Sequence, residues 1–109
     1  MTITGKSFIA GQWVSPAGKA FNSFNPYTGE NFNSFNSCGA EEIEAALVGA
    51  RLAYAAMGSM DGSAIAGLLE AVADEIEGLG DALLETCDAE TGLGLVRLTG
   101  ERGRTTGQL

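Results

Sequence analysis

The sequence contains no histidine among its 109 residues. Histidine is the commonest metal ligand and the commonest general base at neutral pH, so a catalytic site built from these residues alone would depend on carboxylates or thiols. Basic residues are also scarce, with 6 Lys and Arg against 14 Asp and Glu, which gives a formal net charge of -8. This balance argues against nucleic acid as a partner, because nucleic-acid binding is driven by basic side chains that neutralise phosphates.

Long hydrophobic runs are missing as well. The opening segment MTITGKSFIAGQWVSPAGKAF lacks the uninterrupted apolar stretch of a signal peptide, and no segment approaches the roughly 20 apolar residues that span a bilayer. The two cysteines, Cys38 and Cys87, lie far apart and match no C-x-x-C spacing, which argues against a zinc site or a disulfide framework. We therefore expect a cytoplasmic protein with reduced, buried thiols, no bound metal and no membrane partner.

Residues 1–37 predict strands and turns. The segment SFIAGQWV centres on Ala10 and Gly11, and Gly11 can adopt the positive φ that a tight hairpin turn demands. Two turn clusters follow, SPAGKAF and NPYTGE, and the aromatic residues of AFNSF and NFNSFNS indicate further half-buried strands. Trp13, the single tryptophan, is expected to pack the first hairpin onto the helices, because its large apolar ring is worth burying.

Residues 40–109 predict helices. From residue 40 to residue 57 the apolar side chains recur at spacings of three and four, which places them on one helical face. The capping signals predict the other boundaries. The second expected helix is capped by Asp61 or Ser63 and is interrupted at Gly78 and Gly80. The third covers residues 81–91 and stops at Gly92, and the fourth begins at Leu93.

The glycine-rich segments and the carboxylate pairs do not predict an active site. TGLGLVRLTG follows a predicted helix and lacks the third glycine of the dinucleotide fingerprint, which requires a preceding strand. GERGRTTG lacks the Lys-Ser/Thr pair of a phosphate-binding loop. The carboxylate pairs lie on the polar faces of the predicted helices, where solvated charge is the ordinary role. We therefore predict no catalytic, cofactor-binding or metal-ligating residue.

Five segments, taken in order, resemble the amino-terminal part of an aldehyde dehydrogenase: FIAGQWV, FNPYTGE, ARLAYAAM, LLEAVADEIEGLGDALLETCDAETG and LTGERGRTTGQL. The resemblance covers essentially the whole chain, and GERGRTTGQL looks most like the branch that oxidises α-ketoglutaric semialdehyde (2,5-dioxopentanoate). GSMDGSAIAGLLEA departs from the family, which usually has an Arg or Lys before this helix. The resemblance implies an α/β fold in which residues 1–109 form an incomplete, mostly helical part of the NAD(P)-binding domain, with β-hairpins within 1–37 and helices within 40–109.

The resemblance also implies a chemistry. In the family a cysteine attacks the aldehyde, a hydride passes to NAD or NADP, and an activated water releases the acid. The nucleophile, the general-base glutamate and the nucleotide contacts correspond to positions beyond Leu109, and neither Cys38 nor Cys87 matches the nucleophile's motif. The chain is therefore expected to be inactive alone. Its expected partners are the remainder of the enzyme chain, further copies in a homo-oligomer, and a small aldehyde.

Arginines crowd into the end of the chain, where the last thirteen positions hold three of the six basic residues. In the family the corresponding helix lines the tunnel by which the aldehyde reaches the nucleophile, and the GQL ending would place Arg104 on the tunnel side. Residues four apart share a helix face, so Gly100, Arg104 and Gln108 would point together while Arg102 faces elsewhere. Arg104 would bind the substrate carboxylate, with room left by Gly100 and help from Gln108. The alternative is a surface arginine, or one paired with Glu101.

Two other interpretations stay open. The chain could be a self-contained acidic helical module that binds a partner protein through an apolar helix face, or a non-catalytic remnant that associates with a full-length homologue. The sequence encoded downstream of Leu109 would discriminate between these and the enzyme. Because the apolar helix faces would lack the sheet they pack against, we expect the isolated chain to be aggregated, oligomeric or loosely packed.

Overall fold

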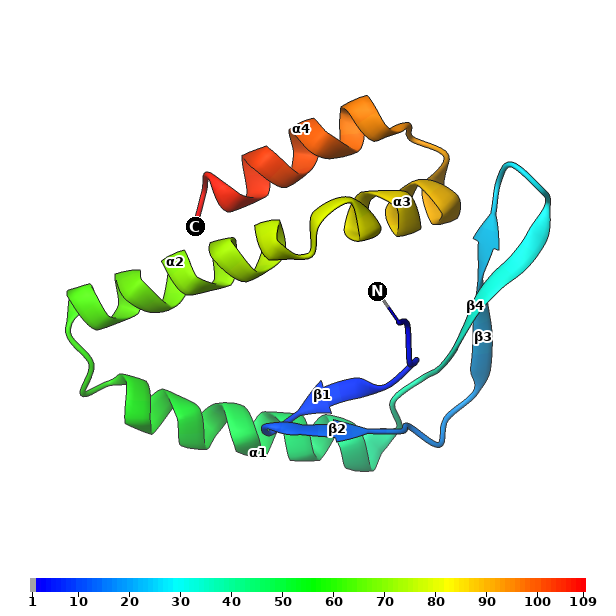
Figure 1. Cartoon of the computed structure of the whole chain (residues 1–109). Helices are drawn as coiled ribbons and strands as arrows, with labels where there is room; N and C mark the ends of the chain where they lie inside the picture. Colours follow the sequence, from blue (N-terminus) through cyan, green and yellow to red (C-terminus); the bar gives the residue numbers. More distant parts are fainter. Residues whose placement is uncertain (1) are drawn as a thin grey trace. The chain divides into compact units, whose positions relative to one another are not determined.

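The computed structural model of the protein describes residues 2–109. Two small antiparallel β-hairpins precede four helices, so the fold is α/β and mostly helical, which confirms the predicted class (Figure 1). The chain divides into two compact units. One consists of Thr2–Ser23 and Asn31–Met60, and the other of Phe24–Glu30 and Asp61–Leu109.

The first hairpin joins β1 (Ser7–Ile9) to β2 (Gln12–Val14) through a two-residue turn. Both turn residues have positive φ, 49° at Ala10 and 81° at Gly11. Positive φ at both positions is the geometry that matches the twist of two short antiparallel strands, so the predicted hairpin is confirmed.

Trp13 does not pack onto a helix, and the prediction that it would is wrong. Its side chain is 65% exposed and its ring lies 5.1 Å from the ring of Phe8, measured between centroids. Phe8 and Trp13 are opposite each other in the strand register. Directly opposed residues project from the same face of a ladder, so the two rings cover each other there and leave their outer surfaces to solvent.

The helix of the same unit, α1 (Ala40–Met57), has the predicted boundaries. The carboxylate of Glu42 accepts a hydrogen bond of 2.7 Å from the backbone N–H of Gly39, just before the first turn. The β1–β2 turn approaches α1 at Gly49, where an added Cβ would lie only 2.9 Å from the Cβ of Ala10. None of the residues of α1 is buried, so its predicted apolar face is exposed in this structure.

The second hairpin pairs β3 (Ala20–Asn25) with β4 (Glu30–Asn36). At its open end the backbone N–H of Ser37 donates to the carbonyl of Lys19 at 3.0 Å. The rings of Phe21 and Phe35 stack across the strands with centroids 5.6 Å apart. The tip of this hairpin, Phe24–Glu30, belongs to the second compact unit.

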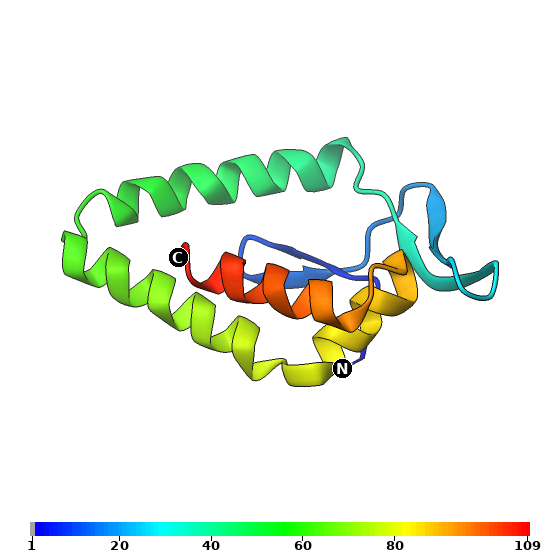
Figure 2. The same cartoon turned by 90° about the horizontal axis from the view of Figure 1, so that it is seen from above.

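The second unit contains α2 (Gly62–Gly78), α3 (Gly80–Thr91) and α4 (Leu95–Thr106). Figures 1 and 2 show α4 running back alongside α2 and α3. Leu84 of α3 and Leu98 of α4, 7% and 8% exposed, are the buried apolar residues of the unit and form its small core.

The helix boundaries in this unit follow from local backbone chemistry. The carboxylate of Asp61 accepts a 2.8 Å hydrogen bond from the N–H of Ala64, so Asp61 caps α2, and Ser63 lies within the helix. Gly92 ends α3 in the left-handed conformation, with φ 66°, as predicted. The last helix begins at Leu95, two residues later than predicted, because Gly94 has φ 85° and ψ 141° and cannot be helical.

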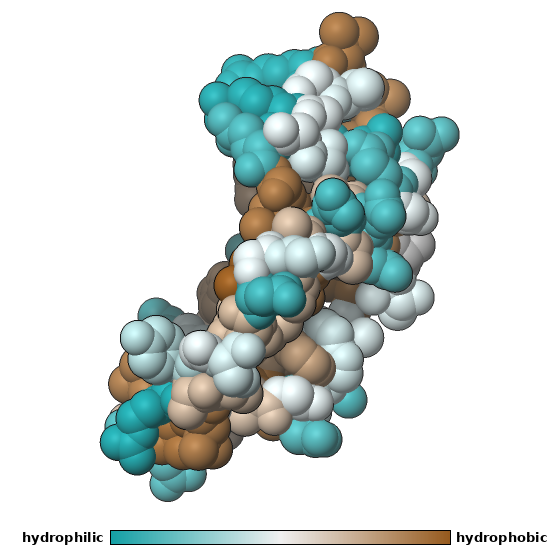
Figure 3. Space-filling model, turned by 90° about the vertical axis from the view of Figure 1, so that its left-hand side faces the viewer, coloured by the Kyte–Doolittle hydropathy of each residue, from teal (hydrophilic) through white to brown (hydrophobic). Residues whose placement is uncertain are grey.

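Many large apolar side chains remain on the surface, and Figure 3 shows brown, apolar atoms among the teal ones on the face that it presents. They come from α1, α2, α4, both hairpins and the residues that flank α3, and include Phe8, Trp13, Tyr27, Leu47, Leu52, Tyr54, Leu68, Leu79, Leu95 and Val96. Exposed apolar area on this scale favours association with other protein surface. Within residues 2–109, no helix has the length and apolar character needed to span a bilayer.

Candidate functional site

The start of α4 is fastened by the side chain of Asp88. One oxygen of this carboxylate accepts hydrogen bonds from the backbone N–H of Gly94 at 2.8 Å and from the hydroxyl of Tyr27 at 2.9 Å. The Asp88 carboxylate thereby raises the pKa of Tyr27 above its ordinary value, first through the hydrogen bond. At Gly92 the hairpin tip comes so close that an added Cβ would lie 3.0 Å from Cγ of Pro26. These contacts join the tip of the second hairpin to the α3–α4 loop.

The inner face of α4 carries Leu98 and Arg102, which are four residues apart. The Nε atom of Arg102 lies 3.0 Å from a carboxylate oxygen of Glu77, and its side chain is 18% exposed. A terminal nitrogen of the same guanidinium donates to the backbone carbonyl of Gly80 at 3.1 Å. The hydroxyl of Thr106 donates to the other carboxylate oxygen of Glu77 at 2.9 Å. Arg102 is therefore committed to the contacts that hold α4 against α2 and α3.

The opposite face of α4 carries Gly100 and Arg104, and both are exposed. A Cβ built on Gly100 meets no atom within 4 Å, so the surface around this glycine is open. Within residues 2–109 the side chain of Arg104 makes no hydrogen bond or ion pair. Glu101, the acidic neighbour that could have neutralised it, pairs instead with Arg97, with Nε and Oε1 3.0 Å apart. The structure thus presents a charged guanidinium beside open space.

Gln108 does not continue this face. The helix ends at Thr106, Gly107 is the C-cap, and the backbone N–H of Gln108 donates to the carbonyl of Thr105 at 3.2 Å. The helical spacing used to group Gly100, Arg104 and Gln108 therefore applies to the first two alone.

The thiols are half-buried, so the prediction of buried cysteines is wrong, and both are free. Cys38 Sγ lies 3.4 Å from the hydroxyl oxygen of Ser7. Cys87 lines a pocket of about 240 Å³ that also touches Leu98 and Arg102. The core of this unit is too small to enclose the thiol. Within the described part of the chain, no three Cys, Asp or Glu side chains are grouped so as to hold a metal ion.

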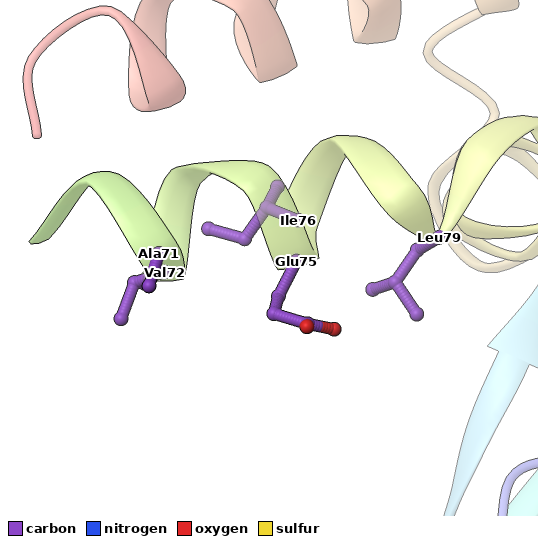
Figure 4. A pocket seen from close by; sticks show the side chains of 5 residues that line it. All are labelled: Ala71, Val72, Glu75, Ile76 and Leu79. Carbon is purple, nitrogen blue, oxygen red and sulfur yellow. The ribbon is translucent and has the colours of Figure 1, made fainter. Parts of the chain in front are cut away.

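A second hollow lies on α2 and has a volume of about 350 Å³. In Figure 4 the side chains of Val72, Glu75 and Leu79 project from α2 on the side away from α4. Apart from Glu75 its lining is apolar, so it offers a contact surface and no combination of a nucleophile with a base.

Sequence reasoning missed the contacts that position α4. Glu77 and Arg102 are 25 residues apart, and nothing in either local sequence distinguishes them from other charged residues on helix surfaces. The role of Asp88 had a weak signal, because a carboxylate in the last turn of a helix that ends in Gly-x-Gly is well placed to accept from the freed backbone N–H groups.

Comparison with known proteins covers nearly the whole chain. The sequence profile of the aldehyde dehydrogenase family matches residues 13–108. The chain is 42% identical over 111 aligned residues to α-ketoglutaric semialdehyde dehydrogenase 2 of Azospirillum brasilense, covering 100% of this chain and 21% of that protein. It is 37% identical over 107 residues to α-ketoglutaric semialdehyde dehydrogenase of Acinetobacter baylyi, covering 96% of this chain and 20% of that protein. The chain therefore spans about a fifth of the length of these relatives.

Solved structures support the same fold at lower sequence identity. The fold matches an NAD-dependent benzaldehyde dehydrogenase from Corynebacterium glutamicum with a TM-score of 0.84 at 20% identity, over 93% of this chain and 22% of the other. It matches a betaine aldehyde dehydrogenase from Staphylococcus aureus, solved in complex with NAD+, with a TM-score of 0.82 at 23% identity, over 93% and 21% of the two chains. With the family profile and the two relatives above, this agreement identifies the chain as a member of the aldehyde dehydrogenase family.

Proposed function

We propose that this chain is the amino-terminal part of the NAD(P)-binding domain of an aldehyde dehydrogenase that oxidises α-ketoglutaric semialdehyde to its acid. Support for this substrate comes from the identity over the whole chain to two enzymes named for it. In this proposal the two hairpins and the four helices form one scaffold with the remainder of the enzyme. The exposed apolar faces of α1 and α2 pack against that remainder or against another subunit of a homo-oligomer.

NAD or NADP would be the hydride acceptor of the complete enzyme. The described residues themselves do not fit a dinucleotide, because Gly92 and Gly94 of TGLGLVRLTG join helix α3 to helix α4, and the element directly before them is a helix and not a strand. We therefore derive no cofactor contact from this segment. Its contribution would be to substrate binding and to the scaffold.

The observation that carries the substrate proposal is the unpaired guanidinium of Arg104 beside the open surface at Gly100. α-Ketoglutaric semialdehyde has a carboxylate at the end remote from its aldehyde group. A guanidinium binds a carboxylate through paired, charge-assisted hydrogen bonds, and a glycine one turn away leaves room for it. Gln108, just beyond the helix, is a candidate second donor to the same carboxylate.

The activity can be tested with the complete protein encoded together with this chain. We expect reduction of NAD+ or NADP+ with α-ketoglutaric semialdehyde, and no turnover by residues 1–109 alone. Absence of activity with every aldehyde tried would contradict the proposal. Specific binding of residues 1–109 to an unrelated protein would then favour the alternative of an acidic helical interaction module.

The role of Arg104 can be tested in the same enzyme. Arg104→Ala should lower kcat/KM for the semialdehyde by roughly 10- to 100-fold, a loss of about 1.5–3 kcal/mol expected for a charged hydrogen bond, and should barely alter turnover of pentanal. Arg51→Ala is the control, because Arg51 is an exposed arginine of α1 and its removal leaves the Arg97–Glu101 pair beside Arg104 intact. Equal losses on both substrates would show that Arg104 has a structural role.

A further inference from the structure

Both carboxylate oxygens of Glu77 contact side chains of α4. Oε2 lies 3.0 Å from Nε of Arg102, and Oε1 accepts from the hydroxyl of Thr106 at 2.9 Å. Arg102 and Thr106 are about one helical turn apart, so the side chain of Glu77 in α2 binds two successive turns of α4. The same guanidinium also donates to the carbonyl of Gly80. We refer to Glu77, Arg102 and Thr106 as the α4 clamp.

The rotation of α4 about its own axis depends on this clamp, because the apolar contacts of the helix are few. Leu98 is the single buried residue of α4, so apolar burial holds the helix at one point and not along the turn that carries Arg102 and Thr106. Gly100 and Gly103 lie within the continuous helix, have low helical propensity and carry no side chain, and a Cβ on either would meet no neighbour within 4 Å. Burial of Leu98 therefore orients the first half of α4, and the clamp holds the second half, which carries Arg104.

The clamp also determines where Arg104 points. Successive residues of an α-helix are separated by about 100°, so Arg102 and Arg104 lie about 200° apart around the axis. With Arg102 held at Glu77 and Gly80, Arg104 must face the opposite side. Without the charge of Glu77, the guanidinium of Arg102 would be partly buried and unpaired. A rotation or a local unwinding of α4 that exposes the Arg102 guanidinium to water would then be favoured.

We propose that Glu77, acting through Arg102 and Thr106, is a positioning residue that keeps Arg104 directed at the substrate carboxylate. The inference rests on the proposed function of Arg104. It adds that specificity for an acidic aldehyde depends on a residue of α2 that faces away from the substrate and does not touch it.

The test is Glu77→Gln in the complete enzyme, a substitution that keeps the shape of the side chain and removes its charge. We expect KM for α-ketoglutaric semialdehyde to rise about 3- to 10-fold with kcat nearly unchanged, and pentanal to be turned over as before. Thr106→Val, which removes one bond of the clamp, should shift KM in the same direction by less. Glu75→Gln is the matched control, because Glu75 lies on the same helix and projects away from α4 (Figure 4).

A double substitution separates positioning from general destabilisation. If Glu77 acts through Arg104, adding Glu77→Gln to Arg104→Ala should change KM for the semialdehyde no further. Additive effects of the two substitutions would overturn the inference. Equal losses on both aldehydes in Glu77→Gln would also overturn it. If Glu77→Gln does not fold, an unchanged KM in folded Thr106→Val would overturn it instead.

The same set of variants distinguishes failure of this inference from failure of the proposed function. A selective loss in Arg104→Ala with no change in folded Glu77→Gln would leave the carboxylate site intact and remove the clamp's role in it. If Arg104→Ala lowered kcat/KM equally for both aldehydes, the carboxylate site itself would be contradicted, and so would the positioning role of Glu77.

Discussion

The substitution Leu98→Ala tests whether the face of α4 that carries Leu98 is the buried face, as it is in this structure. Leu98 is 8% exposed and shares its face of α4 with Arg102, whereas Val96, two residues earlier, is 91% exposed. If the orientation is correct, Leu98→Ala should strongly destabilise the second unit, which contains α2, α3 and α4. Val96→Ala should have almost no effect.

The magnitude follows from the local packing. Leu→Ala removes three carbons, and each buried CH₂ contributes about 0.8 kcal/mol, which gives about 2.4 kcal/mol for the lost burial. Enclosed cavities add a further penalty, but Leu98 already lines a pocket of about 240 Å³, so the new space joins an existing one. We therefore expect a loss of about 2–2.5 kcal/mol, at the low end of the range for core leucines. For Val96→Ala we expect less than about 0.5 kcal/mol.

Hydrogen exchange of the α3 and α4 amides, together with urea unfolding, measures this loss. A destabilisation of that size corresponds to an increase of about 30- to 70-fold in exchange rate for amides that exchange through opening of the unit. A loss of stability in Val96→Ala equal to that in Leu98→Ala would refute the orientation of α4. It would also remove the basis for placing Arg104 on the open face.

Three further predictions follow from particular contacts. The pKa of Glu42 lies below its usual 4.5, first because the backbone N–H of Gly39 bonds its carboxylate. Protection of the first-turn amides of α1, measured against the intrinsic exchange rate at each pH, should therefore fall as pH drops through that lowered pKa. Glu42→Gln should remove this pH dependence. The pKa of Tyr27 is raised by its bond to Asp88, which stabilises the unit below pH 10.0 and fails as pH rises through the raised pKa; a phenolate titration that is unchanged in Asp88→Asn would contradict this. Gly49→Ala should lower the midpoint of urea unfolding by the equivalent of about 1–3 kcal/mol, since its Cβ would lie 2.9 Å from the β1–β2 turn. Gly67→Ala, whose Cβ would meet nothing, should raise it by up to about 1 kcal/mol.

The boundaries of the secondary structure could be predicted where local chemistry sets them. Helix α1 has the predicted limits because its apolar spacing stops at a glycine-rich turn. The turn at Ala10 and Gly11 and the left-handed Gly92 were also predictable, because glycine tolerates the positive φ that Gly11 and Gly92 adopt. In each case the information lies within a few neighbouring residues.

Contacts between distant residues could not be predicted in the same way. Trp13 was expected against a helix, yet it covers Phe8, because the register of the first hairpin decides what a strand residue faces. Arg102 and Arg104 look alike in sequence, and the helical period indicates only that they point apart. In the structure Arg102 is the one that turns inward, where it pairs with Glu77, 25 residues earlier in the chain.

A crystal structure of the complete enzyme with 2-oxoglutarate, the product of the proposed reaction, would test the central claim most directly. We predict that one carboxylate of the product lies within hydrogen-bonding distance of the Arg104 guanidinium, with Arg102 still paired to Glu77. A product carboxylate held by other residues, with Arg104 in solvent or paired to a carboxylate of the protein, would contradict the account.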